Sequence, residues 1–443
     1  MNAGARSFSA PALLATATSP GQPKSLDGGV DASVQMVDLG ARRLLAVLLG
    51  CVAVLTLSGY FLKAQCIGHY NERRDRVLCS NDIQVLYVVR GMHEHPFPYV
   101  HGNLVDHRLV GGALEYPVLT GLFAWVPALL VNDDGGYLQV TALLLAPFSF
   151  LTVWMLAKMV RWRALMYALA PPLVWYSFHN WDLLVVCATV AAFYAWWRQR
   201  YAWSAGWLAI GACLKFWPIF FLLPLLLDRL ADRDRSGAGW SLASFAWVFG
   251  AVNGAFFLAS PRGWWAPYAF QQERAADITS NSIWFWGLPS LGTDDLNTVI
   301  PVLLVLGTVG ACAVGWVRAR AEGVFPFVQV CGAVLAVFML TGKAHSPQYA
   351  LWLLPFFCLL RLRWGWWLGY MLFDLCTYVG IFRWYYALSQ GHDFGLAKQA
   401  LVIGVWGRAV MLLLLIAVFL RSEVAMDEAA DPTPAAERVA VGV

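Results

Sequence analysis

Charged side chains are scarce in this sequence. Asp, Glu, Lys and Arg make up 13% of its 443 residues, whereas soluble proteins carry roughly 25%. Hydrophobic residues make up 59%, and the mean hydropathy is +0.58, so an ordinary soluble globular protein is excluded. The net charge of +4 is too small and too scattered to indicate a nucleic-acid surface. We therefore predict an all-α, polytopic transmembrane protein.

Motifs for metal or nucleotide chemistry are missing as well. The sequence has no CxxC pair, no Walker-type glycine loop, no zincin motif and no GxSxG elbow. A nucleotide-driven reaction is therefore unsupported. We also find no internal repeat and no matched pair of halves, which weakens a transporter function because many secondary transporters are built from repeats.

Cysteine usage leaves one question open. Seven of the nine cysteines lie inside apolar stretches, where Cys behaves as a small hydrophobic residue. Cys66 and Cys79 instead flank a polar segment. They form a disulfide if that segment faces an oxidising exterior, and otherwise they are two free thiols.

Both ends of the chain are polar. Residues 1–42 are rich in Ala, Ser, Gly and Pro, which predicts a disordered cytoplasmic tail rather than a signal peptide. Residues 422–443 are predicted to form a second such tail, with one transmembrane domain between them at 43–421. Two arginines precede its first apolar run, 44–62, so the positive-inside rule places the start of that span in the cytoplasm.

Clusters of Lys and Arg recur between the later apolar runs, and we assign each cluster to the cytoplasmic side. With the first span this predicts about 12 crossings, within a range of about 10 to 13, and several are short for a bilayer about 30 Å thick. The later spans are predicted at 138–159, 164–178, 182–197, 203–214, 217–227, 240–259, 299–317, 323–341, 348–360, 365–381 and 397–420.

Two large outer loops are predicted, at 65–137 and 260–298. Within the first, the stretch 115–131 is apolar, but it ends at an acidic turn that has no Lys or Arg. An odd number of spans must separate the outer end of 44–62 from the basic cluster at 158–163. We therefore assign 115–131 as an interfacial or re-entrant helix on the outside.

Ionisable groups that topology does not require are the functional candidates. Asp82 follows Asn81 just outside the first span, where it is either a helix-capping or solvated turn residue or a general base at the membrane surface. Lys343 and His345 lie in an outer turn, where the positive-inside rule asks for no cation. Lys343 either snorkels to the headgroups or binds a phosphate.

Lys215 lies in an apolar stretch and needs a partner or a polar cavity, because an unpaired Lys in the membrane is costly. Asp182 is the candidate partner in a structural ion pair. Arg274 in the second outer loop is either a solvated charge or a ligand for an anion. His93 and His95 with Glu94 give only weak support for a metal, because no further ligand is evident.

Five short motifs occur in a characteristic order: NDIQVLYVVRG, EYPVLTGLFAW, FHNWDLL, LKFWP and KAHSPQYALWLLP. In this order they resemble the DUF2029 proteins of actinobacterial type, which are similar to glycosyltransferase family 87. That family comprises polyprenol-phosphate-mannose-dependent mannosyltransferases of the GT-C superfamily. The resemblance covers about residues 45–420 and implies a GT-C-like transmembrane fold.

The resemblance implies that Asp82 is the catalytic base in the first outer loop. Its carboxylate would take a proton from an acceptor hydroxyl as that oxygen attacks the anomeric carbon, with inversion of configuration. The donor would be a polyprenyl-phosphate sugar, with mannose favoured and arabinofuranose as the alternative. The acceptor would be a cell-envelope glycan or glycolipid.

Cations are implied around the donor phosphate, because the leaving phosphate gains charge in the transition state. Lys343, His345, Arg274 and Lys215 are the candidates, with Lys343 preferred to Lys215. His345 and Phe216 differ from the residues expected in relatives, which makes His345 a weaker candidate than Lys343. The implied substrate cavity contains Asn81, Tyr87, Arg90, Glu115, Tyr116, Asn180, Asp182, Trp284 and Gln348.

No metal and no cofactor are expected, since a sugar-phosphate lipid is already activated. The expected location is the plasma membrane, with the site facing the exterior. A transporter or lipid flippase is the main rival, in which Asp182 and Lys215 would be a coupling pair, and a noncatalytic relative is a third alternative. A first outer loop of about 70 residues favours an enzyme that works at the membrane surface.

Overall fold

The computed structural model describes residues 27–393 and 395–426. The chain divides into two compact units, residues 1–43 and 44–443, and the fold described below is that of the second. Helix α1 (Asp27–Ala64) begins inside the segment that the sequence assigned to the N-terminal tail. The remaining parts of the predicted tails, 1–26 and 427–443, lie outside the described residues.

Helices dominate the described residues, which confirms the all-α class. Five apolar helical segments within them are long enough to cross a membrane. Large apolar side chains point outward from them, such as Leu258 and Trp247, which are 83% and 74% exposed. The segments are Gly40–Ala64 of α1, Asp134–Ala168, which joins α5 (Asp134–Val160) to α6 (Leu165–Ala168), α11 (Arg235–Ala259), α14 (Thr293–Glu322) and α18 (Leu396–Arg421).

Shorter apolar helices fill the interior. Helices α8 (Asp182–Trp197), α15 (Phe327–Thr341) and α16 (Ala350–Leu359) are buried over most of their surface, as expected of helices that are apolar all round. Next to them lie α9 (Tyr201–Leu214) and α17 (Trp364–Ser389). These helices lie where the sequence predicted spans, but they do not establish the predicted count of 12.

Prolines accompany two breaks between helices, one inside a predicted span and one between two predicted spans. The stretch 164–178 is not one helix, because α6 ends before the pair Pro171 and Pro172 and a separate short helix, α7 (Pro172–Tyr176), follows. The predicted boundary between the spans 203–214 and 217–227 is confirmed, and it lies at Trp217 and Pro218. Lys215 has extended backbone, and the 3-10 helix η3 (Trp217–Phe221) then leads into α10 (Leu222–Ala231).

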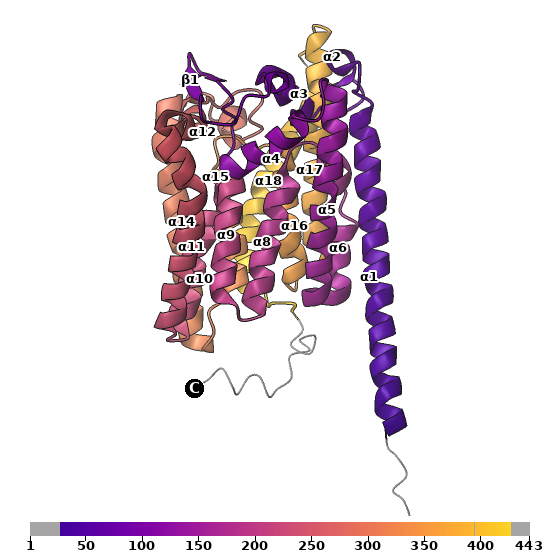
Figure 1. The fold of residues 1–443 in the computed structure, drawn as a ribbon, viewed down its shortest axis with the longest axis vertical. Coiled ribbons are helices and arrows are strands. Elements are labelled where there is room, and N and C mark those ends of the chain that lie inside the picture. The colour runs from indigo at the N-terminus through magenta and orange to yellow at the C-terminus, as the bar shows by residue number, and fades with distance from the viewer. Residues whose placement is uncertain (1–26, 394, 427–443) are drawn as a thin grey trace, which may run out of the picture. The chain divides into compact units, whose positions relative to one another are not determined.

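The predicted outer loops gather at one end of the bundle, where Figure 1 shows α3, β1 and α12 together. The disulfide between Cys66 and Cys79 is present, which settles the alternative that the sequence left open. The first loop contains α2 (Tyr70–Arg73), α3 (Asp82–Val89), η1 (Met92–Glu94), the antiparallel pair β1 (Asn103–Val105) and β2 (Arg108–Val110), and α4 (Val118–Ala128). The second contains α12 (Pro261–Glu273) and α13 (Ile283–Gly287).

Candidate active site

A cavity of roughly 450 Å³ lies among the two outer loops and the ends of the interior helices. Its walls come from the start of α3, the turn before α4, the break after α9, the end of α12, the 3-10 helix η4 (Pro347–Tyr349) and α17. Six of the residues that the sequence singled out line it: Asp82, Glu115, Tyr116, Lys215, Arg274 and Gln348.

Asp82 is the first residue of α3, but it does not cap that helix. The N-cap is Asn81, whose side-chain oxygen accepts a hydrogen bond from the Gln84 N–H at 2.9 Å. The Asp82 carboxylate is therefore free to face the cavity. Asn180 orients it by donating from Nδ2 to Oδ2 at 2.7 Å, and the Asp82 N–H donates to the carbonyl of His179 at 2.7 Å.

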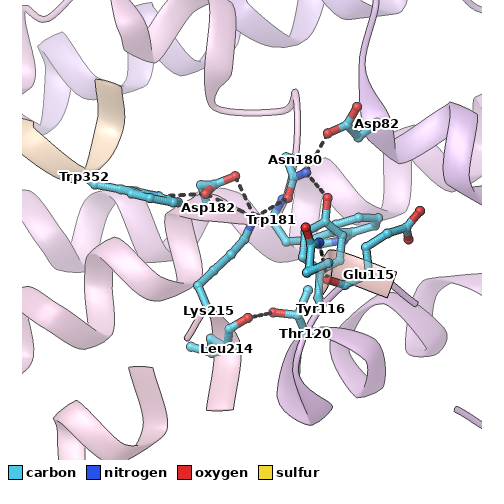
Figure 2. Close-up of polar contacts among 11 residues, drawn as sticks. Asp82, Glu115, Tyr116, Thr120, Asn180, Trp181, Asp182, Leu214, Lys215 and Trp352 are labelled. Atoms are coloured by element: carbon cyan, nitrogen blue, oxygen red, sulfur yellow. Dashed lines mark hydrogen bonds and ion pairs between the residues drawn. The ribbon is translucent and has the colours of Figure 1, made fainter. Parts of the chain in front are cut away.

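Asn180 connects Asp82 to a buried cation (Figure 2). The Lys215 ammonium donates to Asn180 Oδ1 at 3.2 Å and lies 3.4 Å from a carboxylate oxygen of Asp182. Trp352 donates from Nε1 to the same carboxylate at 2.7 Å. The partner that the sequence proposed for Lys215 is therefore present, and Lys215 also lines the cavity.

Tyr116 completes this network. The Lys215 ammonium lies 4.2 Å from the centre of the Tyr116 ring, a cation–π contact, and Asn180 Nδ2 donates to the Tyr116 hydroxyl at 2.5 Å. The Thr120 hydroxyl donates to the carbonyl of Leu214 at 2.6 Å, so α4 holds the end of the helix that presents Lys215. Figure 2 shows this chain of contacts.

Opposing effects act on the Asp82 carboxyl. Burial, the largest effect, raises its pKa above the ordinary value, while the Asn180 hydrogen bond and the charges of Lys215, Arg274 and Lys63 lower it. Burial outweighs the others, so the net direction is upward. A carboxylate with a raised pKa beside cations in a cavity has the properties of a general base.

Lys343 and His345 do not line this cavity. Lys343 donates to the backbone carbonyl of Gln272 at 3.0 Å and to Asn297 Oδ1 at 2.7 Å, so it ties α12 to α14. His345 is buried, and its backbone N–H donates to Ser280. Burial, and secondarily the Arg408 charge, lower the pKa of His345 well below its ordinary value, so its ring is neutral at pH 7. The sequence favoured Lys343 over Lys215 as a ligand of the donor phosphate, but it is Lys215 that lines the cavity beside Asp82.

The remaining predicted cavity residues lie outside the cavity wall. Asn180 and Asp182 are fully buried behind it and support Asp82 and Lys215. Arg90 forms an ion pair with Glu115. The Asn81 side chain accepts a hydrogen bond from the Gln84 N–H. The Tyr87 hydroxyl donates to the Val131 carbonyl, and Trp284 Nε1 donates to the Thr341 carbonyl.

Lys63 and His179 are functional candidates that the sequence reasoning missed. The buried Lys63 ammonium donates to the Ser80 carbonyl at 2.8 Å and to the Tyr378 hydroxyl at 3.1 Å. Ser80 lies two residues before Asp82 in the sequence. His179 lines the cavity, and its Nδ1 lies 3.0 Å from the same Ser80 carbonyl. Lys63 follows the first span on the side predicted to be outer, so the criterion that selected Lys343 also applied to it.

The side chains that commonly bind metal ions do not form a cluster among the described residues. The described residues contain no group of three or more His, Cys, Asp or Glu side chains that could hold a metal ion. His93 and Glu94 are largely exposed, with their nearest side-chain atoms 3.9 Å apart.

A comparison with protein families matches residues 114–341, just over half of the chain, to the model of glycosyltransferase family 87. The chain belongs to glycosyltransferase family 87. A comparison with curated proteins finds no match. With its apolar helices, the chain is a membrane glycosyltransferase of this family. The matched region includes Lys215 and Arg274 but begins after Asp82, so the family match does not bear on the role of Asp82.

Proposed function

We propose that this family 87 member transfers a sugar from a polyprenyl-phosphate donor to a cell-envelope glycan or glycolipid at the outer face of the plasma membrane. Mannose is the favoured sugar. One observation carries the proposal: the Asp82 carboxylate lines the same cavity as Lys215 and Arg274. A base and two cations in one cavity match the needs of a reaction in which a hydroxyl displaces a phosphate.

In the proposed reaction the acceptor oxygen attacks the anomeric carbon while Asp82 takes its proton. The new C–O bond forms as the bond between the anomeric carbon and the phosphate oxygen breaks, and the phosphate leaves with the electron pair. Attack from the face opposite the phosphate inverts the anomeric configuration. Asn180 would keep Oδ2 of Asp82 hydrogen-bonded and so leave Oδ1 available for the proton.

Charge on the departing phosphate is the second requirement of the reaction. Lys215 and Arg274 line the cavity, and cations that are already in place stabilise developing negative charge without a cost of reorganisation. Lys215 is held by Asn180 and Asp182 before any substrate binds. Two cations would supply the charge that a metal ion supplies elsewhere, so the proposal includes neither a metal nor a cofactor.

The proposal is tested by transfer assays in membranes that contain the wild-type chain or Asp82→Asn. We expect the variant to lose transfer by about a hundredfold or more, because general-base catalysis contributes about 10²–10⁴-fold. Radiolabelled polyprenyl-phosphate mannose and polyprenyl-phosphate arabinose are supplied in parallel, and this comparison decides between the two sugars.

Asp106→Asn is the matched control for this assay. Asp106 is an exposed residue of the same outer loop, in the β1–β2 turn, with a φ of 47° that Asn also adopts readily. It should transfer sugar like the wild type. Wild-type rates in Asp82→Asn would refute the assignment of the base, and label that only changes leaflet without a new glycan would favour a flippase.

A further inference from the structure

A second pocket, of roughly 420 Å³, lies where three segments that are distant in sequence meet. These are the turn between α5 and α6, the residues after α16 and the residues after α18. Three of its six lining residues are arginines, and none is acidic. The lining residues are Val160, Arg161, Trp162, Arg163, Arg361 and Ala425.

This arginine pocket lies far from the Asp82 cavity. The first residue of α5, Asp134, accepts a hydrogen bond from Gln84 of α3 at 2.7 Å, so α5 begins beside the helix that carries Asp82. It then runs for 27 residues to Val160, a length of about 40 Å. The two pockets are therefore at opposite ends of the bundle, on opposite sides of a membrane that it spans.

Backbone pairing builds the walls of the arginine pocket. The Ala425 N–H donates to the carbonyl of Leu359 at 2.8 Å, and the Arg361 N–H donates to that of Glu423 at 2.8 Å. The segment after α18 is thus attached to the end of α16, although the sequence had assigned it to a tail. Arg163 donates to the carbonyls of Phe357 and Cys358, each at 3.1 Å, and so satisfies groups at the C-terminal end of α16.

The positive charge of this pocket is poorly neutralised. Glu423 lies 3.9 Å from Arg361, but these two side chains are 78% and 60% exposed, and such pairs contribute little. Arg161 is also exposed. The cluster around Arg229, by contrast, is paired, since Arg229 has both Asp228 and Asp232 at 2.7 Å.

Tryptophans accompany these arginines. Trp162 is 54% exposed in the pocket wall, and Trp364, the first residue of α17, is 52% exposed. Exposed Trp beside Arg is typical of the interface between a bilayer and water. These tryptophans therefore favour a position of the pocket at the depth of lipid headgroups rather than in bulk solvent.

We propose that the arginine pocket binds the phosphate headgroup of an anionic phospholipid, in the leaflet opposite the Asp82 cavity. Arg161 and Arg361 bind the phosphate, which suits the planar donors of arginine, while Trp162 packs against the lipid at the interface. Basic pockets between transmembrane helices favour such headgroups. The site is separate from the proposed transfer reaction and does not depend on it.

The test is native mass spectrometry of the full chain released from nanodiscs that contain equal amounts of phosphatidylglycerol and phosphatidylcholine. The wild type should retain phosphatidylglycerol selectively. Arg161→Gln with Arg361→Gln should lower its retention about tenfold. The control pair, Arg235→Gln with Arg320→Gln, removes two exposed arginines at the same end of the bundle and should retain the lipid like the wild type.

Other outcomes identify other occupants. Equal loss of lipid in the test and control pairs would mean attraction by overall charge, and this would overturn the proposal. Displacement of the lipid by millimolar inorganic phosphate would indicate a site for soluble phosphate instead. The sequence continues after the pocket with the acidic residues Asp427 and Glu428. If phosphatidylglycerol were retained only by a variant that ends at Met426, this acidic segment would be the occupant of the pocket, and the proposal would be overturned.

Discussion

Lys215 is the residue whose two proposed roles can be separated experimentally. Replacing it by Met leaves the Asp182 carboxylate buried without its cation, which typically costs about 3–5 kcal/mol, and removes a charge from the cavity. We expect Lys215→Met to unfold at a lower temperature and to lose transfer by about a hundredfold or more. Adding Asp182→Asn should restore much of the thermal stability, because no unpaired charge is then buried.

Transfer should stay low in this double variant, since the cavity still lacks the cation. The measurements are the unfolding temperature in nanodiscs and kcat with the polyprenyl-phosphate donor. If the double variant regains both stability and transfer, Lys215 acts only as a structural partner of Asp182.

The pH dependence of transfer reports on Asp82. Because the proposed reaction needs the Asp82 carboxylate and burial raises its pKa, kcat/KM should fall as the pH drops through a value above the ordinary pKa of an Asp, about 3.9. The Arg274 charge lowers the pKa of Asp82, so Arg274→Gln should move this acid limb to higher pH. Arg262→Gln, which alters an exposed arginine of the same outer loop, should leave the limb in place.

At the scale of elements, the segment that leads into α3 is tied to its surroundings at nearly every residue. The Tyr378 hydroxyl donates to the Leu78 carbonyl at 2.6 Å. Lys63 donates to the Ser80 carbonyl, and the Tyr70 hydroxyl donates to the Asn81 carbonyl at 2.8 Å. The Cys66–Cys79 disulfide joins the same segment to the chain just after α1. These contacts fix the backbone from which Asp82 projects.

Loss of the disulfide should therefore lower kcat more than it changes KM. The Asp82 carboxylate, the proposed base, would be held less firmly in position, but no substrate contact would be removed. A disulfide that closes a loop of this length typically contributes about 3 kcal/mol. We expect reductant to lower kcat about tenfold in the wild type and Cys66→Ser with Cys79→Ser to match that loss. Reductant should have no further effect on the double variant; a further loss would place the redox-sensitive group elsewhere.

Elements and site differ in how well the sequence predicts them. Apolar runs gave the helix positions because burial in a membrane protein demands continuous apolar sequence. The pair at Pro171 and Pro172 broke the stretch 164–178, a local signal that hydropathy alone does not weigh. The cavity was harder, because whether Lys215 or Lys343 reaches Asp82 depends on which way each turn faces after packing.

At the scale of the whole molecule, the proposed function requires the Asp82 cavity to face the exterior. Asp106 lies in the β1–β2 turn of the first outer loop. Ala321 lies near the end of α14, a helix of 30 residues, about 45 Å long. This helix begins near α12, where Asn297 donates to the Gln272 carbonyl at 3.0 Å. Asp106 and Ala321 are both exposed and lie at opposite ends of the bundle.

In intact cells, a membrane-impermeant thiol reagent should label Asp106→Cys and should label Ala321→Cys only after the membrane is opened. The parent chain is the control, because its described free cysteines are buried or half-buried and should react little. The reverse pattern would place the Asp82 cavity and its acceptor in the cytoplasm. The arginines at the other end would then contradict the positive-inside rule, which the proposed orientation satisfies.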